Sequence, residues 1–132
     1  MAGMDRVRIS GTATASAVAD AGATEKVILT SSPVSTPRQG ATITITGHVN
    51  ETPGTGGTAV VVRVRRGTLT GTVVGVAETD TLAAGNSESI AIDCVDSGID
   101  VDGMVYVVTV QVTGAGANAG TVNFASITVI IS

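Results

Sequence analysis

The chain has 132 residues, enough for one domain with its own core and too few for two ordinary domains. Its net charge of −4 argues against nucleic acid as a partner, because phosphate binding requires clustered cations. Apolar residues make up 43% of the chain and aromatic residues only 2%, no apolar run is long enough for a membrane helix, and the single cysteine excludes an intrachain disulfide.

The first 25 residues are rich in Ala, Thr, Ser and Gly, with a short alternating piece from Arg6 to Ile9. They hold too few bulky apolar side chains to become ordered without a neighbour. We therefore expect an N-terminal arm or edge strand over residues 1–25 and a β-sandwich domain over residues 26–132. We expect no secretory signal, because no basic start followed by an apolar stretch is present.

The rest of the chain alternates between runs of Val, Ile and Thr and connectors rich in Gly and Pro. Two-residue alternation and β-branched side chains are typical of strands. They predict strands at residues 26–30, 41–50, 59–66, 72–78, 88–94, 104–113 and 121–131. An acidic loop is expected from Asp96 to Gly103.

No segment has the length and period of an amphipathic helix, so parallel βαβ units are excluded. The pattern predicts an all-β fold, an antiparallel, jelly-roll-like β-sandwich of about seven or eight strands. An immunoglobulin-like sandwich is the close alternative, although the chain lacks the tryptophan and the second cysteine typical of that fold.

Residues that could carry chemistry are scarce. Asp93, Asp96, Asp100 and Asp102 look like a fragment of a calcium loop, but the full spacing and its terminal Glu are absent. We therefore expect a solvated acidic loop and no metal.

His48 is the only histidine, and we expect it at a strand end near a turn. Cys94 is in phase with Ile90 and Ile92, as a small buried apolar group would be. No catalytic constellation results, and the glycine-rich connectors lack the residues of a phosphate-binding loop. We expect no enzyme activity, no cofactor and no small-molecule ligand. The only rings, Tyr106 and Phe124, lie in apolar strands and are expected in the core.

Arginines form the only basic cluster. Period two places Arg63 and Arg65 on the face opposite Val60, Val62 and Val64, and Arg66 follows. Arg6 and Arg8 repeat the alternation near the N-terminus. Because guanidinium groups suit bidentate contacts with carboxylates, two interpretations remain open: contacts to acids on a partner chain, or a solvated strand face.

Several segments between Ala41 and Ile131, about two thirds of the chain, resemble the small jelly-roll virion proteins of tailed bacteriophages, the capsid decoration or cement proteins and related head-fibre domains. The segments are 60–68 (VVVRVRRGT), 83–86 (AAGN), 104–110 (MVYVVTV) and 124–130 (FASITVI).

This resemblance implies a non-enzymatic decoration protein that trimerises and stabilises the phage head by bridging capsomers of the major capsid protein. It would be made in the host cytoplasm and would lie on the capsid exterior, with no membrane or nucleic-acid partner. The mean hydropathy of +0.44 agrees with burial of apolar surface between copies. The alternatives are a receptor- or glycan-binding sandwich of a phage fibre or adhesin, and another virion subunit such as a tail-tube protein.

Overall fold

The computed structural model describes residues 8–19, 21–34, 41–54, 58–79, 82–83, 85–99, 103–114 and 120–131. These residues form eight strands and no helix. The strands are β1 (Arg8–Ala19), β2 (Lys26–Thr30), β3 (Ala41–Thr52), β4 (Ala59–Arg66), β5 (Val73–Glu78), β6 (Glu88–Ile99), β7 (Tyr106–Thr113) and β8 (Thr121–Ile131).

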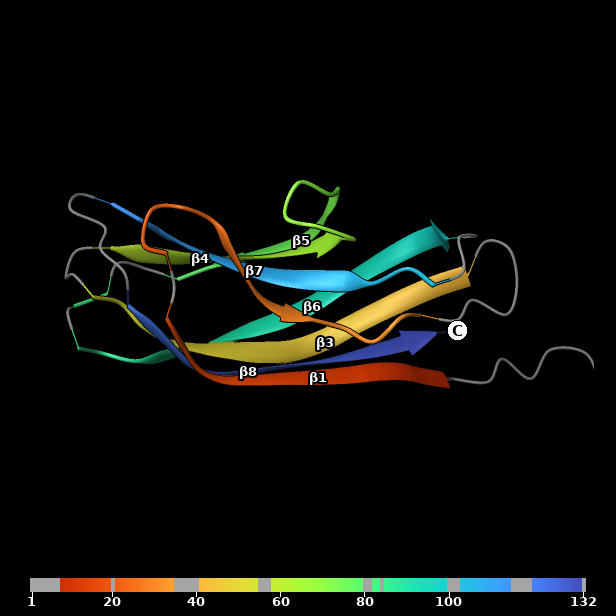
Figure 1. The fold of residues 1–132 in the computed structure, drawn as a ribbon, viewed down its shortest axis with the longest axis horizontal. Helices are drawn as coiled ribbons and strands as arrows, with labels where there is room; N and C mark the ends of the chain where they lie inside the picture. The colour runs from red at the N-terminus through yellow and green to blue at the C-terminus, as the bar shows by residue number, and fades with distance from the viewer. Residues whose placement is uncertain are drawn as a thin grey trace, which may run out of the picture.

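The strands form two four-stranded antiparallel sheets, with the orders β1-β8-β3-β6 and β2-β7-β4-β5. Figure 1 shows β1, β8, β3 and β6 as one layer and β4, β5 and β7 as the other. Along the chain, β1 pairs with β8, β2 with β7, β3 with β6 and β4 with β5, so the ribbon is folded back on itself. This is the jelly-roll order. The predicted all-β sandwich is therefore confirmed, and the immunoglobulin-like alternative is wrong.

The core lies between the two sheets and is built from small aliphatic side chains around one ring, the fully buried Tyr106. Each sheet contributes alternate residues of its strands, as period two requires. The largest aliphatic side chains with almost no exposure are Ile43, Ile45, Ile127, Val34, Val49, Val60, Val62, Val64, Val108 and Val110. The alternation predicted for residues 59–66 is confirmed, since Arg63 and Arg65 lie on the opposite face.

β1 is an edge strand of the first sheet, paired with β8 from Arg8↔Ile131 to Ala19↔Thr121, which is the edge-strand alternative expected for residues 1–25. The bounds of three other strands differ from the prediction by one or two residues, since β3 ends at Thr52, β5 begins at Val73 and β7 begins at Tyr106. β6 continues to Ile99, five residues beyond the predicted end at Cys94. The expected loop at Asp96 is therefore wrong, because Asp96 pairs with Ile43 within the sheet and is buried.

The close approach of β3 to β8 explains why position 47 is a glycine. A Cβ atom at Gly47 would lie 1.9 Å from the carbonyl oxygen of Ser126 and 2.9 Å from the Cα atom of Ile127. No side chain fits at such distances, so the central strands of this sheet require glycine at that position.

Candidate functional site

The basic cluster on β4 contacts the connector between β1 and β2. Arg65 donates two hydrogen bonds to the Glu25 carboxylate, Nε to Oε1 at 3.0 Å and Nη2 to Oε2 at 2.9 Å. Arg63 Nη1 lies 3.4 Å from Glu25 Oε1 and donates to Gln111 Oε1 at 2.8 Å. Thr109, on the neighbouring strand β7, donates to Glu25 at 2.7 Å. One carboxylate thus joins β4, β7 and the β1–β2 connector.

The backbone of this connector also contacts β7. The carbonyl oxygen of Ala23 accepts a hydrogen bond from the Gln111 amide, and that of Gly22 accepts one from the Val112 backbone N–H. Burial by itself would raise the pKa of Glu25, but the hydrogen bonds from Arg65 and Thr109 and the two arginine charges outweigh it and hold this pKa below its usual value. The network fastens the connector to the outer face of the second sheet.

The third arginine of the cluster links the two sheets. Arg66, at the end of β4, donates both Nε and Nη2 to the Asp96 carboxylate on β6, with Nε to Oδ2 at 2.7 Å. Tyr106, on β7, donates its hydroxyl to the same Oδ2 at 2.8 Å. The Asp96 side chain is 5% exposed and that of Arg66 34% exposed, so the pair extends from the surface into the core.

Electrostatics follow from this geometry. Burial would raise the pKa of Asp96, but the hydrogen bonds from Arg66 and Tyr106 and the guanidinium charge hold it below its usual value. Burial and the hydrogen bond to Asp96 raise the pKa of the Tyr106 hydroxyl well above its usual value. Asp96 is therefore a carboxylate and Tyr106 a neutral donor at neutral pH.

The arginines expected to contact a partner thus have acidic partners in their own chain. Arg63 and Arg65 pair with Glu25, and Arg66 pairs with Asp96. The backbone of Arg8 pairs with Ile131 in the other sheet, and its side chain lies outside what the structure describes, as does Arg6. Contacts of these arginines with a second protein stay a prediction.

The expected acidic group divides in two. Asp93 is exposed on the outer face of β6, whereas Asp96 points between the sheets. Asp100 and Asp102 lie outside the described residues. Within the described ranges, no group of three His, Cys, Asp or Glu side chains could hold a metal ion.

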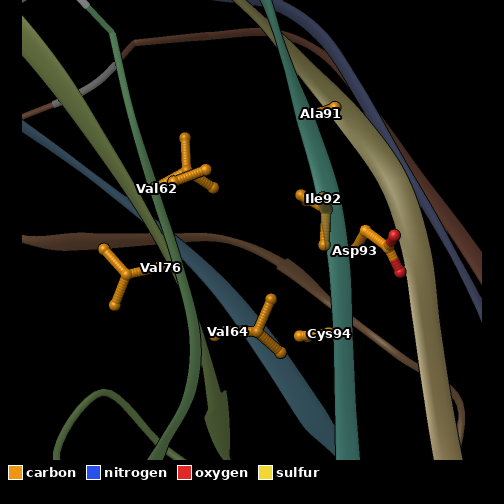
Figure 2. Close-up of a pocket in the computed structure, with 9 residues that line it drawn as sticks. Val62, Val64, Val76, Ala91, Ile92, Asp93 and Cys94 are labelled. Carbon is orange, nitrogen blue, oxygen red and sulfur yellow. The ribbon is translucent and has the colours of Figure 1, made fainter.

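A pocket of about 120 Å³ opens between the edge strands β5 and β6. In Figure 2, Ile92 and Cys94 project from β6 towards Val64, while Asp93 projects to the other side of the strand. A Cβ atom at Gly75 would lie 2.6 Å from the Cβ atom of Cys94, so the glycine permits the two strands to approach. The lining residues are Val62, Val64, Gly75, Val76, Ala77, Ala91, Ile92, Asp93 and Cys94.

The pocket thiol has no base to activate it among the described residues. Burial, with the nearby charges of Asp93 and Asp96, raises the pKa of Cys94 to about 11. His48 lies on the outer face of β3, opposite Ala91, whereas Cys94 is directed inward. The sheet therefore separates the two residues, and His48 cannot deprotonate Cys94. The phase predicted for Cys94 is confirmed, and its burial is partial.

The outer face of the first sheet carries a feature that the sequence did not predict. Phe124 is 44% exposed, so its expected place in the core is wrong. The register between β3 and β8 shifts between Asn50 and Glu51, and this irregularity leaves both Asn123 and Phe124 exposed. A bulge redirects side chains in this way. The Phe124 ring packs edge-on against His48, with ring centroids 4.5 Å apart and planes at 78°.

His48 also differs from expectation, because it lies in the middle of β3 and not at a strand end. Asn50 and Thr52 follow His48 on the same face of β3. The side-chain amide of Asn123 donates to Asn50 Oδ1 at 2.7 Å and to Thr52 Oγ1 at 2.8 Å. These groups come from adjacent strands of one sheet and line the same outer face as Phe124.

Comparisons with known proteins identify a fold and no family. No family model matches the chain, and no curated protein matches it. Among solved structures, a mutant VP2 protein of infectious bursal disease virus in derived T=1 particles aligns with a TM-score of 0.64 and 13% identity over 96% of this chain. The structure of the infectious bursal disease virus Gx strain aligns with a TM-score of 0.57 and 13% identity over 97% of this chain.

In both alignments the chain spans 32% of the virus protein, about a third of its length. A structure of Bacillus endospore appendages, which are disulfide-linked pili, aligns at 20% identity over 100% of this chain and 93% of that chain, with a TM-score of 0.45. What the likenesses show is that the chain shares a jelly-roll fold with a domain of viral capsid proteins. In the part of the chain that the structure describes, no helix is long and apolar enough to cross a membrane.

Proposed function

We propose that the chain is a non-enzymatic structural protein of a virus particle. The observation that carries this proposal is the jelly-roll order of all eight strands, which aligns over 96% of the chain with a viral capsid protein. The chemistry of the described residues supports it. The only thiol has a raised pKa and is separated from the only histidine by the sheet, and the charged side chains on β4 are used in ion pairs that fasten the fold.

The more specific form of the proposal is a decoration protein on the exterior of a bacteriophage head, where a homotrimer bridges subunits of the major capsid protein. The fold suits this role, because two cross-linked sheets form a rigid unit. Val76 and Val95 are 62% and 57% exposed on the outward faces of the edge strands β5 and β6, and they favour burial of apolar surface against another protein. On a particle, many weak contacts would add up through avidity.

The test is the mass of the native chain by light scattering at two concentrations, followed by cosedimentation with capsids that lack the protein. A concentration-independent trimer that binds capsids and raises their melting temperature is expected. A monomer that neither associates nor binds capsids would overturn the proposal.

Variants would locate the contact surface. Val76→Asp and Val95→Asp are expected to weaken trimer formation or capsid binding, and Thr128→Asp, on a central strand of the first sheet, is the matched control. Equal behaviour of all three variants would place the contact away from the β5 and β6 edges.

Of the alternative functions, a tail-tube subunit is favoured by no particular observation. A glycan-binding module is favoured by one, the exposure of Phe124, which also motivates the inference below.

A further inference from the structure

The exposed ring of Phe124 is not explained by the fold. Among the described aromatic residues, Tyr106 is fully buried, whereas Phe124 leaves 44% of its surface to solvent in the middle of a sheet. Exposure of a large ring forgoes the stability that its burial would provide. The next residues on this face of β8, Ser126 and Thr128, are polar, so a polar residue at position 124 would suit this surface equally well.

The bulge in β8 gives the ring a polar neighbour. Asn123 and Phe124 are adjacent in sequence and would point to opposite faces of a regular strand. Here both are exposed, while Val122 and Ala125 on either side are fully buried. Bulges often orient side chains at binding sites.

Hydrogen bonds fix the polar groups beside the ring. Asn123 donates to Asn50 and Thr52, and Asn50 Nδ2 donates to Ser89 Oγ at 3.0 Å. The Thr52 hydroxyl is also hydrogen-bonded to that of Ser87. Amides and hydroxyls can both donate and accept, so an ordered group of them can match a ligand that does the same.

The ring is held in place as well. His48 meets Phe124 in an edge-to-face contact, a favourable arrangement for two aromatic rings, and the Ser126 hydroxyl lies 3.5 Å from His48 Nδ1. We call these residues the Phe124 face: Phe124, His48, Asn50, Thr52, Ser87 and Asn123.

We propose that the Phe124 face binds a neutral carbohydrate. A sugar ring presents C–H groups on its faces, which pack on an aromatic ring, and hydroxyls on its rim, which both donate and accept hydrogen bonds. The Phe124 face supplies the ring and the matching amide and hydroxyl groups side by side. The face contains no arginine or lysine that could pair with the acidic group of a sialylated or sulfated sugar, which favours a neutral sugar.

The position of the site on the outer face of a sheet indicates the form of the ligand. Small-molecule sites are normally concave and enclose their ligand, whereas this face belongs to a sheet surface and can cover only one side of a sugar. Single contacts of this kind are weak, so the ligand would be a repeated glycan met by several copies of the chain at once. Such binding goes beyond the structural role proposed above, and it rests on that role only for the several copies of the chain.

The experiment uses the full chain coupled in many copies to fluorescent beads, applied to an array of neutral, sialylated and sulfated oligosaccharides. Binding to one or more neutral glycans, competed by the same free sugar, is the expected result. Phe124→Ala and Asn123→Ala should each reduce binding about tenfold, the effect of losing one ring or amide contact. Leu69→Ala is the matched control, because it removes an exposed apolar side chain in the turn after β4, away from the Phe124 face, and should bind as the native chain does.

Circular dichroism melts would show that each variant is folded. A folded Phe124→Ala variant that binds normally, binding only to charged glycans, or no binding to any glycan would each overturn the proposal. If Phe124→Ala instead dissociates an oligomer of a chain that binds no glycan, the face is a contact between copies, and the carbohydrate proposal is wrong. Trimer formation and capsid binding are measured separately, so failure of one proposal can be told from failure of the other.

Discussion

The guanidinium of Arg66 on β4 is bonded to the carboxylate of Asp96 on β6, so one ion pair joins the two sheets near the end of β4. The Tyr106 hydroxyl, from β7, completes the coordination of the carboxylate. In a core built from small aliphatic side chains, this link fixes the position of one sheet relative to the other. Hydrophobic packing is non-directional, whereas this hydrogen-bond geometry admits a single alignment.

Removal of the arginine should therefore destabilise the fold. Arg66→Met leaves the Asp96 carboxylate buried without its cation, and we expect a loss of about 2–3 kcal/mol in the free energy of unfolding, below the range for a fully buried pair because Arg66 is a third exposed. Urea unfolding followed by circular dichroism measures it. Asp93→Asn, on the exposed side of β6, is the control and should change stability by less than about 0.5 kcal/mol. Equal stability of Arg66→Met and the native chain would contradict this account.

Stability should fall in acid. Glu25 and Asp96 both have pKa values lowered in the folded state from ordinary values of 4.5 and 3.8. The unfolded chain then binds more protons than the folded one, so the contribution of these groups is complete above about pH 4.5 and is lost as the pH falls through their folded pKa values.

Thermal melts from neutral pH into acid test this prediction. The double variant Glu25→Gln, Asp96→Asn should have a lower melting temperature than the native chain at neutral pH. Below about pH 4.5, its melting temperature should fall less steeply than that of the native chain. A native chain whose melting temperature does not change through this range would show that neither ion pair contributes to stability.

Gly47 should tolerate no side chain. In Gly47→Ala, the new Cβ atom would meet the backbone of β8 at a distance that requires the two central strands to separate. We expect a loss of at least about 2 kcal/mol, within the range for overpacking of a dense interior. Chemical unfolding provides the measurement, and Ala91→Ser, at an exposed position in the same sheet, is the control. A stable Gly47→Ala variant would mean that β3 and β8 are further apart than the structure has them.

The thiol of Cys94 should react slowly. Its pKa of about 11, against an ordinary value of 9.0, lowers the thiolate fraction at neutral pH by roughly a hundredfold, and the thiolate is the nucleophile. Labelling by a disulfide reagent should be slow in the native chain and should become fast in denaturant. Rapid labelling of the folded chain would contradict the burial of this residue behind Gly75 and Val64.

The sequence predicted the strands well, because every strand that has one buried face must alternate. The segments 26–30, 59–66 and 121–131 have the predicted bounds. The end of β6 was missed because Asp96 looks like a loop residue. Its burial depends on Arg66, thirty residues earlier in the chain, and Tyr106, ten residues later, and no local pattern reveals such a cross-sheet partner.

The site on the first sheet was missed for a different reason. Phe124 was assigned to the core by its residue type, although it shares its phase with Ser126 and Thr128, while Ile127 and Val129 occupy the buried phase. That shared phase was a signal for exposure. The ion pairs of Arg63 and Arg65 with Glu25 could not be predicted, because Glu25 follows β1 and reaches β4 only through the fold.

The pairing of Arg8 with Ile131 places the two ends of the described chain on neighbouring strands. A circular permutant can therefore be made by joining Ile131 to Arg8 through a short linker and opening the chain in the turn after Arg66, where Thr68, Leu69 and Thr70 are exposed. Such a permutant would retain every ladder of both sheets. It would also place the new termini in the turn between the end of β4 and the start of β5, so that a fused cargo protein would be displayed at that end of the second sheet.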